Sequence, residues 1–265
     1  MNQIDIADLD CVYLSYDEPQ KEEFWVKIRN MIPWAKRVDG VKGSDAAHKA
    51  AANASDSDRF ILIDGDNIPD PEFFNLQLRL DSSNVDCVFR WKARNHINGL
   101  MYGNGGMSCW TKDFVQNMRT HEAADAANGE VDFCWEDGYR PMTDSHSVSY
   151  INGSPFQAWR AGFREGVKMS LVDGVLPDNP NVGKLPWHNT HRLKIWMSVG
   201  SHVENGQWAM LGARHGCWKT NCTDWDHIEV RDFELLNKIW QEVKDLEINS
   251  ALEQYGALLN TDFGL

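Results

Sequence analysis

The chain has 265 residues and a formal net charge of −13, with 26 lysines and arginines against 39 aspartates and glutamates. Hydrophobic residues make up 42% of the sequence, which is enough for a packed core and excludes a disordered chain. No apolar run approaches the roughly 20 residues of a membrane helix, and residues 1–10 lack the basic and then apolar pattern of a secretory signal, so we expect a cytoplasmic protein with no membrane partner.

The first half of the chain alternates between predicted strands and predicted helices. Short apolar runs predict strands at residues 10–16, 34–38, 59–64, 86–91 and 107–110. Between them, helices are predicted at residues 21–31, at 45–54 with Ser44 as N-cap, and at 111–118 with Thr111 as cap. This β-α-β-α-β order is typical of a doubly wound α/β sheet.

The second half of the chain reads as mainly helical. Residues 154–171 predict a strongly amphipathic helix, because the apolar residues from Phe156 to Leu171 fall on one stripe. A loop rich in Pro, Gly and Asn follows, and further helices are predicted at residues 190–199, 205–214 and 233–243. We expect one globular unit, in which residues 1–175 form a catalytic core and residues 176–265 form a helical region that completes the active site.

The most informative segment is residues 60–69, in which an apolar strand ends in two aspartates. Asp64 and Asp66 are one residue apart, so in extended backbone their side chains face the same way. Ligands of open α/β sheets bind beyond the carboxyl ends of the strands, and Gly65 would let a ligand approach the backbone. Paired carboxylates there suit Mg²⁺ or Mn²⁺ held jointly with phosphate oxygens. The plain alternative is a polar turn after a buried strand.

Other families with paired acids fit this segment less well. An EF-hand loop needs an oxygen ligand and then a glycine where this chain has Ile68 and Pro69. A phosphatase of the haloacid dehalogenase type would carry its aspartates on the first strand. A nucleotidyltransferase would have a glycine-rich basic loop after that strand, and residues 16–20 are not one. The six cysteines form no C-x-x-C pair, so we expect reduced thiols and no zinc site.

With these elements the chain resembles the GT-A glycosyltransferases, in particular the family-2-like group. The shared pattern is a first strand at 11–16, a second strand ending in Asp39, a G…A…N helix at 43–53 and the strand with D-x-D. The resemblance implies a Rossmann-like mixed sheet flanked by helices, with a helical C-terminal extension. It also implies a metal, Mn²⁺ or Mg²⁺, on Asp66 aided by Asp64. The expected donor is a nucleotide-sugar, with UDP as the carrier, bound by Tyr13, Ser15, Asp39 and Lys42.

The same resemblance assigns further residues to the site. Gly105 and Gly106 are expected at the donor, although an ordinary hairpin would explain the same glycines. Glu136 and Asp137 resemble the acidic pair whose aspartate is the general base in inverting members. In a retaining enzyme Asp137 would instead orient the substrate.

Members of this fold often supply a late histidine to the metal. We favour His188 and His191, which are spaced i, i+3 beside Trp187, over His202 and His215. Tryptophans stack on sugars and bases. Of the 12 in this chain, those expected near the site are Trp110, Trp135 and Trp187.

Short stretches of the chain, at residues 33–38, 40–50 and 198–200, are similar to glycosyltransferases of tailed phages. Some of those enzymes decorate hydroxymethylated pyrimidines in DNA, which makes such DNA the preferred acceptor. The alternatives are a glycan, lipid or protein acceptor, or a noncatalytic nucleotide- or sugar-binding module. Two basic sets would suit phosphate contacts: Arg90, Lys92 and Arg94 on one strand face, and Arg160, Arg164 and Lys168 on one helix face. The net charge argues against tight nonspecific binding of duplex DNA.

Overall fold

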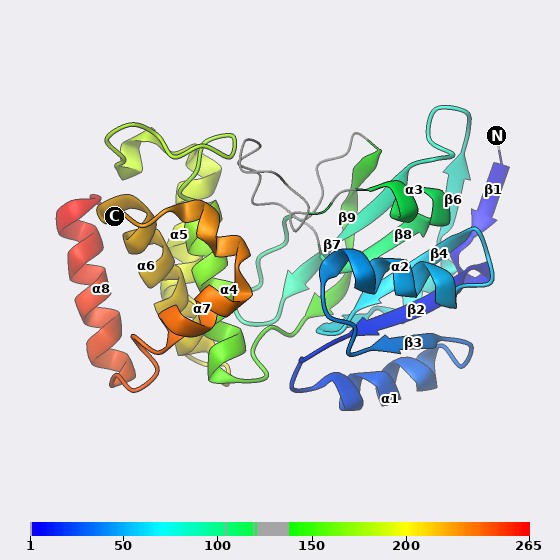
Figure 1. Cartoon of the computed structure of the whole chain (residues 1–265), viewed down its shortest axis with the longest axis horizontal. Coiled ribbons are helices and arrows are strands. Elements are labelled where there is room, and N and C mark those ends of the chain that lie inside the picture. Colours follow the sequence, from blue (N-terminus) through cyan, green and yellow to red (C-terminus); the bar gives the residue numbers. More distant parts are fainter. Residues whose placement is uncertain (1, 104, 119, 121–137) are drawn as a thin grey trace. The chain divides into compact units, whose positions relative to one another are not determined.

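The computed structural model describes residues 2–103, 105–118, 120 and 138–265. The described residues up to Tyr150 form one compact unit, unit 1, and those from Ile151 onward form another, unit 2. Figure 1 labels the elements of both units. No helix in the described ranges has both the length and the apolar character needed to cross a membrane.

Unit 1 is built on a mixed sheet, which among the described residues has seven strands in the order β3-β2-β4-β8-β7-β9-β5. The strands are β2 (Asp10–Ser15), β3 (Lys36–Asp39), β4 (Arg59–Asp64), β5 (Asn67–Pro69), β7 (Val88–Asn95), β8 (Met107–Thr111) and β9 (Tyr139–Ser149). β2 runs parallel to both β3 and β4, and β8 is antiparallel to β4 and β7. The carboxyl ends of the three parallel strands β3, β2 and β4 therefore lie side by side, and we call this end of the strands the carboxyl edge of the sheet. A separate antiparallel pair joins β1 (Asn2–Asp5) to β6 (Gln77–Leu80).

Helices cover both faces of this sheet (Figure 1). They are α1 (Lys21–Met31), α2 (Ser44–Ala54) and α3 (Lys112–Asn117), with the short 3₁₀ helices η1 (Ile6–Asp8) and η2 (Pro71–Asn75). On β4, Ile61 and Ile63 pack on the side of α1, whereas Phe60 and Leu62 pack on the side of α2 and α3. A strand buried on both faces needs a continuous apolar run, which is what residues 60–63 provide. The predicted mixed α/β sheet flanked by helices is confirmed.

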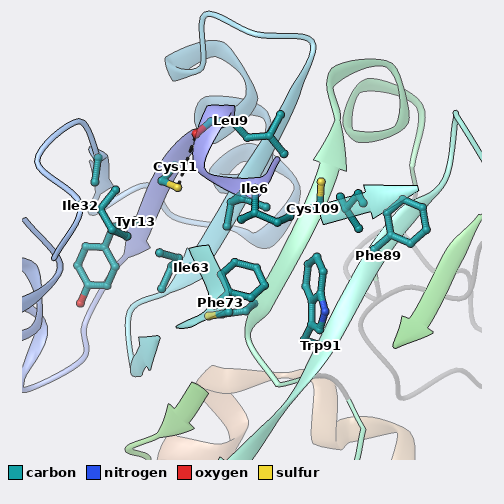
Figure 2. Close-up of a cluster of buried hydrophobic side chains, with 14 of the residues drawn as sticks. Ile6, Leu9, Cys11, Tyr13, Ile32, Ile63, Phe73, Phe89, Trp91 and Cys109 are labelled. Atoms are coloured by element: carbon teal, nitrogen blue, oxygen red, sulfur yellow. Dashed lines mark hydrogen bonds between the residues drawn. The ribbon is translucent and has the colours of Figure 1, made fainter. Parts of the chain in front are cut away.

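The core on the α1 side is aromatic and contains the three thiols of Cys11, Cys87 and Cys109; Figure 2 labels Cys11 and Cys109. Phe73 of η2 meets Trp91 of β7 edge to face, with ring centroids 4.8 Å apart. Burial raises the pKa of Cys11 to about 12 and that of Cys109 to about 11, so both stay protonated. The five described cysteines are all free, as expected from their scattered positions.

Unit 2 is helical. Its helices are α4 (Pro155–Lys168), α5 (Trp187–Ser198), α6 (Gly206–Cys222), α7 (Phe233–Trp240) and α8 (Ile248–Asp262), with the 3₁₀ helices η3 (Val182–Lys184) and η4 (His227–Arg231). The backbones of α4 and α6 touch, because a Cβ atom on Gly162 would overlap the carbonyl of Ala209 and one on Gly212 would overlap that of Trp159. α4, which the sequence analysis grouped with the first part of the chain, therefore packs within unit 2.

Several element boundaries differ from the sequence-based predictions. α2 begins at Ser44, and its N-cap is Gly43 with φ of +95°, so Ser44 is not the cap. α6 continues to Cys222 and not to residue 214, because its glycines face α4 and do not end the helix. α8 was not predicted, and neither were β1, β5, β6 and β9.

Candidate functional site

The two aspartates of the D-x-D segment lie at the carboxyl edge of the sheet, where β4 ends, on a turn that is held from three sides. The hydroxyl of Tyr13 donates a hydrogen bond of 2.7 Å to the carbonyl of Gly65. The amide of Asp64 donates to the carbonyl of Gly106 at 2.8 Å, and the amide of Tyr150 donates to that of Asp66 at 2.7 Å. The turn is thus fixed by hydrogen bonds to its backbone groups.

A third carboxylate, Glu18, joins the two aspartates. Its side chain lies against Gly65, where it would collide with any Cβ atom. Burial, and after it the negative charges of Asp66 and Glu18, raise the pKa of Asp64 well above its usual value. Sequence reasoning missed Glu18. The available signal was its place just after β2, since parallel neighbouring strands deliver the residues that follow them to the same edge.

Gly105 and Gly106 have packing reasons to be glycines. Gly106 has φ of +75°, and a Cβ atom there would overlap the side-chain amide of Asn67 and lie 3.0 Å from Oδ2 of Asp64. At Gly105 a Cβ atom would overlap the backbone of β7. Gly106 therefore allows the chain to pack closely beside Asn67 and Asp64, and Gly105 allows it to pack against β7. Contact of either glycine with a donor sugar remains a prediction.

Asn67 orients the second aspartate. Its Nδ2 donates to Oδ1 of Asp66 at 2.7 Å. The Oγ of Ser147 on β9 in turn donates to Oδ1 of Asn67 at 3.0 Å, which fixes the amide so that its donor side faces Asp66. Asn67 is a positioning residue that the D-x-D pattern alone does not reveal.

Ser15 and Asp39 are brought together, as the predicted nucleotide site requires. They are paired in register across β2 and β3, and the Oγ of Ser15 donates to Oδ1 of Asp39 at 2.7 Å. The Nζ of Lys21 donates to the same oxygen at 2.8 Å. Burial alone would raise the pKa of Asp39, but the bonds from Lys21 and Ser15 and the charge of Arg37 outweigh it and lower that pKa. Asp39 is thus held ionised at the carboxyl edge of the sheet.

The other two residues of the predicted nucleotide site differ in burial, because Tyr13 is buried and Lys42 is exposed. Tyr13 is fully buried, and its ring stacks on Trp25 with centroids 5.9 Å apart. Its observed role is to hold the Gly65 carbonyl, so contact with a nucleotide remains a prediction. Lys42 is exposed in the turn between β3 and α2.

The remaining predicted residues are not part of this cluster. Glu136, Asp137 and Trp135 lie outside the described residues. His188, His191 and His202 are exposed residues of unit 2, and His215 is fully buried there. The described ranges contain no group of three or more His, Cys, Asp or Glu side chains arranged to hold a metal ion together.

The donor set at the end of β4 nevertheless fits a hard divalent cation. Carboxylate oxygens are the ligands that Mg²⁺ prefers, and that ion usually keeps several sites for water and substrate phosphate. Burial first, and the negative charges of Asp66 and Glu18 after it, raise the pKa of Asp64, and a bound cation would favour the ionised form against all three. Asp64 and Asp66 are the residues that could hold such an ion, with Glu18 close by.

Arg90 of the first predicted basic set, and all three residues of the second, have aromatic or acidic partners. The guanidinium of Arg90 lies 5.1 Å from the ring centroid of Tyr139. Those of Arg160 and Arg164 lie 5.2 Å and 5.1 Å from the ring centroid of Phe233, and Lys168 pairs with Glu165. These residues are partly engaged within their own units, which weakens them as phosphate contacts.

No family model, curated protein or solved structure matches the chain. The resemblance to GT-A glycosyltransferases therefore rests on the motifs of the sequence.

Proposed function

We propose that the chain is a metal-dependent glycosyltransferase of the GT-A type, which moves a sugar from a nucleotide-sugar to a hydroxyl acceptor. The observation that carries the proposal is the pair of carboxylates Asp64 and Asp66 at the end of a parallel strand, with Glu18 against the Gly65 between them. The pair shares the carboxyl edge of the sheet with Ser15 and Asp39. A nucleoside diphosphate needs carboxylates that could hold a cation, with polar side chains beside them at the ends of parallel strands.

In this proposal each side chain has a defined task. Asp64 and Asp66 hold Mn²⁺ or Mg²⁺, and Asn67 keeps the carboxylate of Asp66 in place. The bound ion would supply charge neutralisation to the departing diphosphate. Asp39 and Ser15 bind the nucleoside, with UDP as the expected carrier.

The transfer itself exchanges one bond for another. The acceptor oxygen forms a bond to the anomeric carbon, while the bond from that carbon to the diphosphate oxygen breaks and its electron pair leaves with the diphosphate. In an inverting reaction the hydroxyl proton passes to Asp137, because a neutral hydroxyl is a poor nucleophile. In a retaining reaction Asp137 orients the substrate instead.

We propose hydroxymethylpyrimidine in DNA as the acceptor. A base within a duplex would have to be flipped or already unpaired to be reached. The support for this acceptor is the similarity of short stretches to phage enzymes. A glycan, lipid or protein acceptor would use the same donor chemistry.

The test is transfer of labelled sugar from a panel of UDP-sugars, with Mn²⁺, to hydroxymethylated and to plain DNA. We expect label on the hydroxymethylated DNA, loss of transfer in Asp66→Asn, and normal transfer in the matched control Asp113→Asn, whose carboxylate is exposed on α3. Label on oligosaccharide alone would replace the DNA acceptor. No metal-dependent release of UDP with any acceptor would favour a noncatalytic binding module.

A further inference from the structure

α5 presents an outward face with an unusual composition. Its exposed residues Trp187, His188, His191 and Lys194 are spaced i, i+1, i+4 and i+7, so they lie on one side of the helix. Seven residues of α-helix span about 10 Å. The face therefore forms a short ridge that carries one large aromatic ring, two imidazoles and a lysine.

The aromatic ring at one end of this ridge is unusually open. Trp187 is 78% exposed, more than any other large hydrophobic residue among those described. Its ring centroid lies 6.1 Å from that of His188 and 6.2 Å from that of His191. An indole left in water at the start of a helix is a large apolar surface with a polar edge, which suits stacking against a planar partner.

The helix that carries this ridge is anchored in unit 2 by buried side chains and hydrogen bonds. The opposite side of α5 buries Leu193 and Trp196. The Nδ2 of the buried Asn189 donates to the carbonyl of Leu171 at 3.0 Å, and the Nη2 of Arg214 donates to that of Met197 at 2.8 Å. Both bonds fix the helix from within unit 2, so the exposed side chains share a stable platform.

The local charge of this segment is opposite to that of the chain. Residues 179–203 contain no aspartate or glutamate, but they contain Lys184, Arg192 and Lys194, in a protein with net charge −13. Lys194 forms no ion pair with any described residue. Basic side chains in a stretch without acidic residues attract anions at short range.

We propose that this ridge, with Lys184 three residues before Trp187 in the sequence, binds a single-stranded segment of nucleic acid. One base stacks on Trp187, and the backbone phosphates contact Lys184 and Lys194. Stacking on an aromatic ring and a positive track along the phosphates are the two elements of single-strand binding. A neutral glycan could use the ring but not the lysines. The inference deepens the proposed function, because it assigns to this chain a surface that binds the DNA acceptor. It rests on the proposed function for the role of that DNA as acceptor.

The test is fluorescence anisotropy of a labelled single-stranded oligonucleotide with the whole chain, without any sugar donor. We expect Trp187→Ala to weaken binding between about 5-fold and 100-fold. Lys194→Ala should reduce the slope of log affinity against log salt by about 0.7, the value for one lost phosphate contact on a single strand. The matched control is Trp34→Ala, which removes another exposed tryptophan, 46% exposed in unit 1, and should bind normally.

The result separates this inference from the proposed function. Equal binding by Trp187→Ala and Trp34→Ala, or no binding of the oligonucleotide by the wild type, overturns the inference. Sugar transfer to hydroxymethylated DNA that is unchanged in Trp187→Ala also overturns it and leaves the proposed enzyme standing. Binding that depends on Trp187, without transfer to any acceptor, supports the surface and refutes the enzyme.

Discussion

The carboxylate carbon of Glu18 lies 2.5 Å from the point where a Cβ atom on Gly65 would stand. Glycine at position 65 therefore lets a third acidic side chain enter beside Asp64 and Asp66. Because the charge of Glu18 adds to that of Asp66 in raising the pKa of Asp64, the approach of Glu18 has an electrostatic consequence as well as a steric one.

We predict that Glu18→Gln lowers the pKa of Asp64 toward its ordinary value, because it removes one neighbouring negative charge and keeps the shape of the side chain. The measurement is an NMR titration of the aspartate carboxyl carbons. Glu72→Gln, an exposed glutamate of η2, is the control and should leave Asp64 unchanged. An unchanged titration in Glu18→Gln would refute the coupling.

Asp64 itself should cost the protein stability at neutral pH. A carboxyl whose pKa is raised on folding binds more protons in the folded than in the unfolded state, so stability falls as the pH rises from its ordinary pKa of 3.8 toward the raised value. Asp64→Asn removes that loss. We expect the variant to be more stable at pH 7 by on the order of 1 kcal/mol, and inactive in sugar transfer.

Urea denaturation at pH 7 and near pH 3.5 measures this effect. The gain should shrink at the lower pH, where the folded and unfolded states both hold the proton. Asp113→Asn serves again as the control, with no expected gain at either pH. A loss of stability in Asp64→Asn at pH 7 would mean that the carboxylate is a structural group.

The contact between α4 and α6 makes a separate prediction. A Cβ atom on Gly212 would overlap the carbonyl of Trp159, which is backbone and cannot turn aside. We expect Gly212→Ala to force the helices apart and to destabilise unit 2 by roughly 1–3 kcal/mol. Hydrogen exchange of the α6 amides measures the loss.

Gly256→Ala is the matched control for Gly212→Ala. Gly256 also lies inside a helix, but a Cβ atom there would meet only the end of the Arg214 side chain, at 3.0 Å. Alanine favours helix over glycine by about 1 kcal/mol, whereas Arg214, which donates to the carbonyls of Met197 and Leu252, must shift slightly, so this variant should be destabilised far less than Gly212→Ala. Destabilisation of both variants to the same extent would remove the argument from helix contact.

The parts of the fold that the sequence predicted well are those whose pattern is local. β4 is a continuous apolar run, and α1 combines an apolar stripe with charged residues, so both have the predicted bounds. β9 is mostly polar and partly exposed, and no alternation distinguishes it from a loop. The length of α6 could not be predicted either, because Gly216, just beyond the predicted end, favours a helix end unless its close approach to Phe163 of α4 is known.

The same distinction applies to the candidate site. Asp64 and Asp66 are neighbours in sequence at the end of a strand, and their pattern alone indicated an acidic corner. Glu18 comes to that corner from the end of another strand, and Asn67 acts through a bond to Ser147 on β9. Such contacts depend on the pairing of strands, which a single sequence does not specify.

His215 gives unit 2 a stability that depends on pH. The ring is fully buried and contacts Phe163 and Tyr255 at centroid distances of 5.2 Å and 4.9 Å. Burial lowers its pKa below the ordinary 6.5, and Glu242, 3.6 Å from Nε2, offsets only part of that effect. The unfolded chain therefore takes up a proton more readily than the folded one, so the stability that is present above pH 6.5 is lost as the pH falls toward the lowered pKa.

We expect His215→Phe, which keeps an aromatic ring in the same place, to flatten the fall in stability between pH 7 and pH 5. The bond with His215 is the main cause that lowers the pKa of Glu242, and the variant removes it, but Lys219, 3.4 Å from the carboxylate, remains to favour its ionised form. Urea denaturation at the two pH values, followed by tryptophan fluorescence, is the measurement. His202→Gln, at an exposed position, should keep the wild-type dependence. An equally steep fall in His215→Phe would mean that another group takes up the proton.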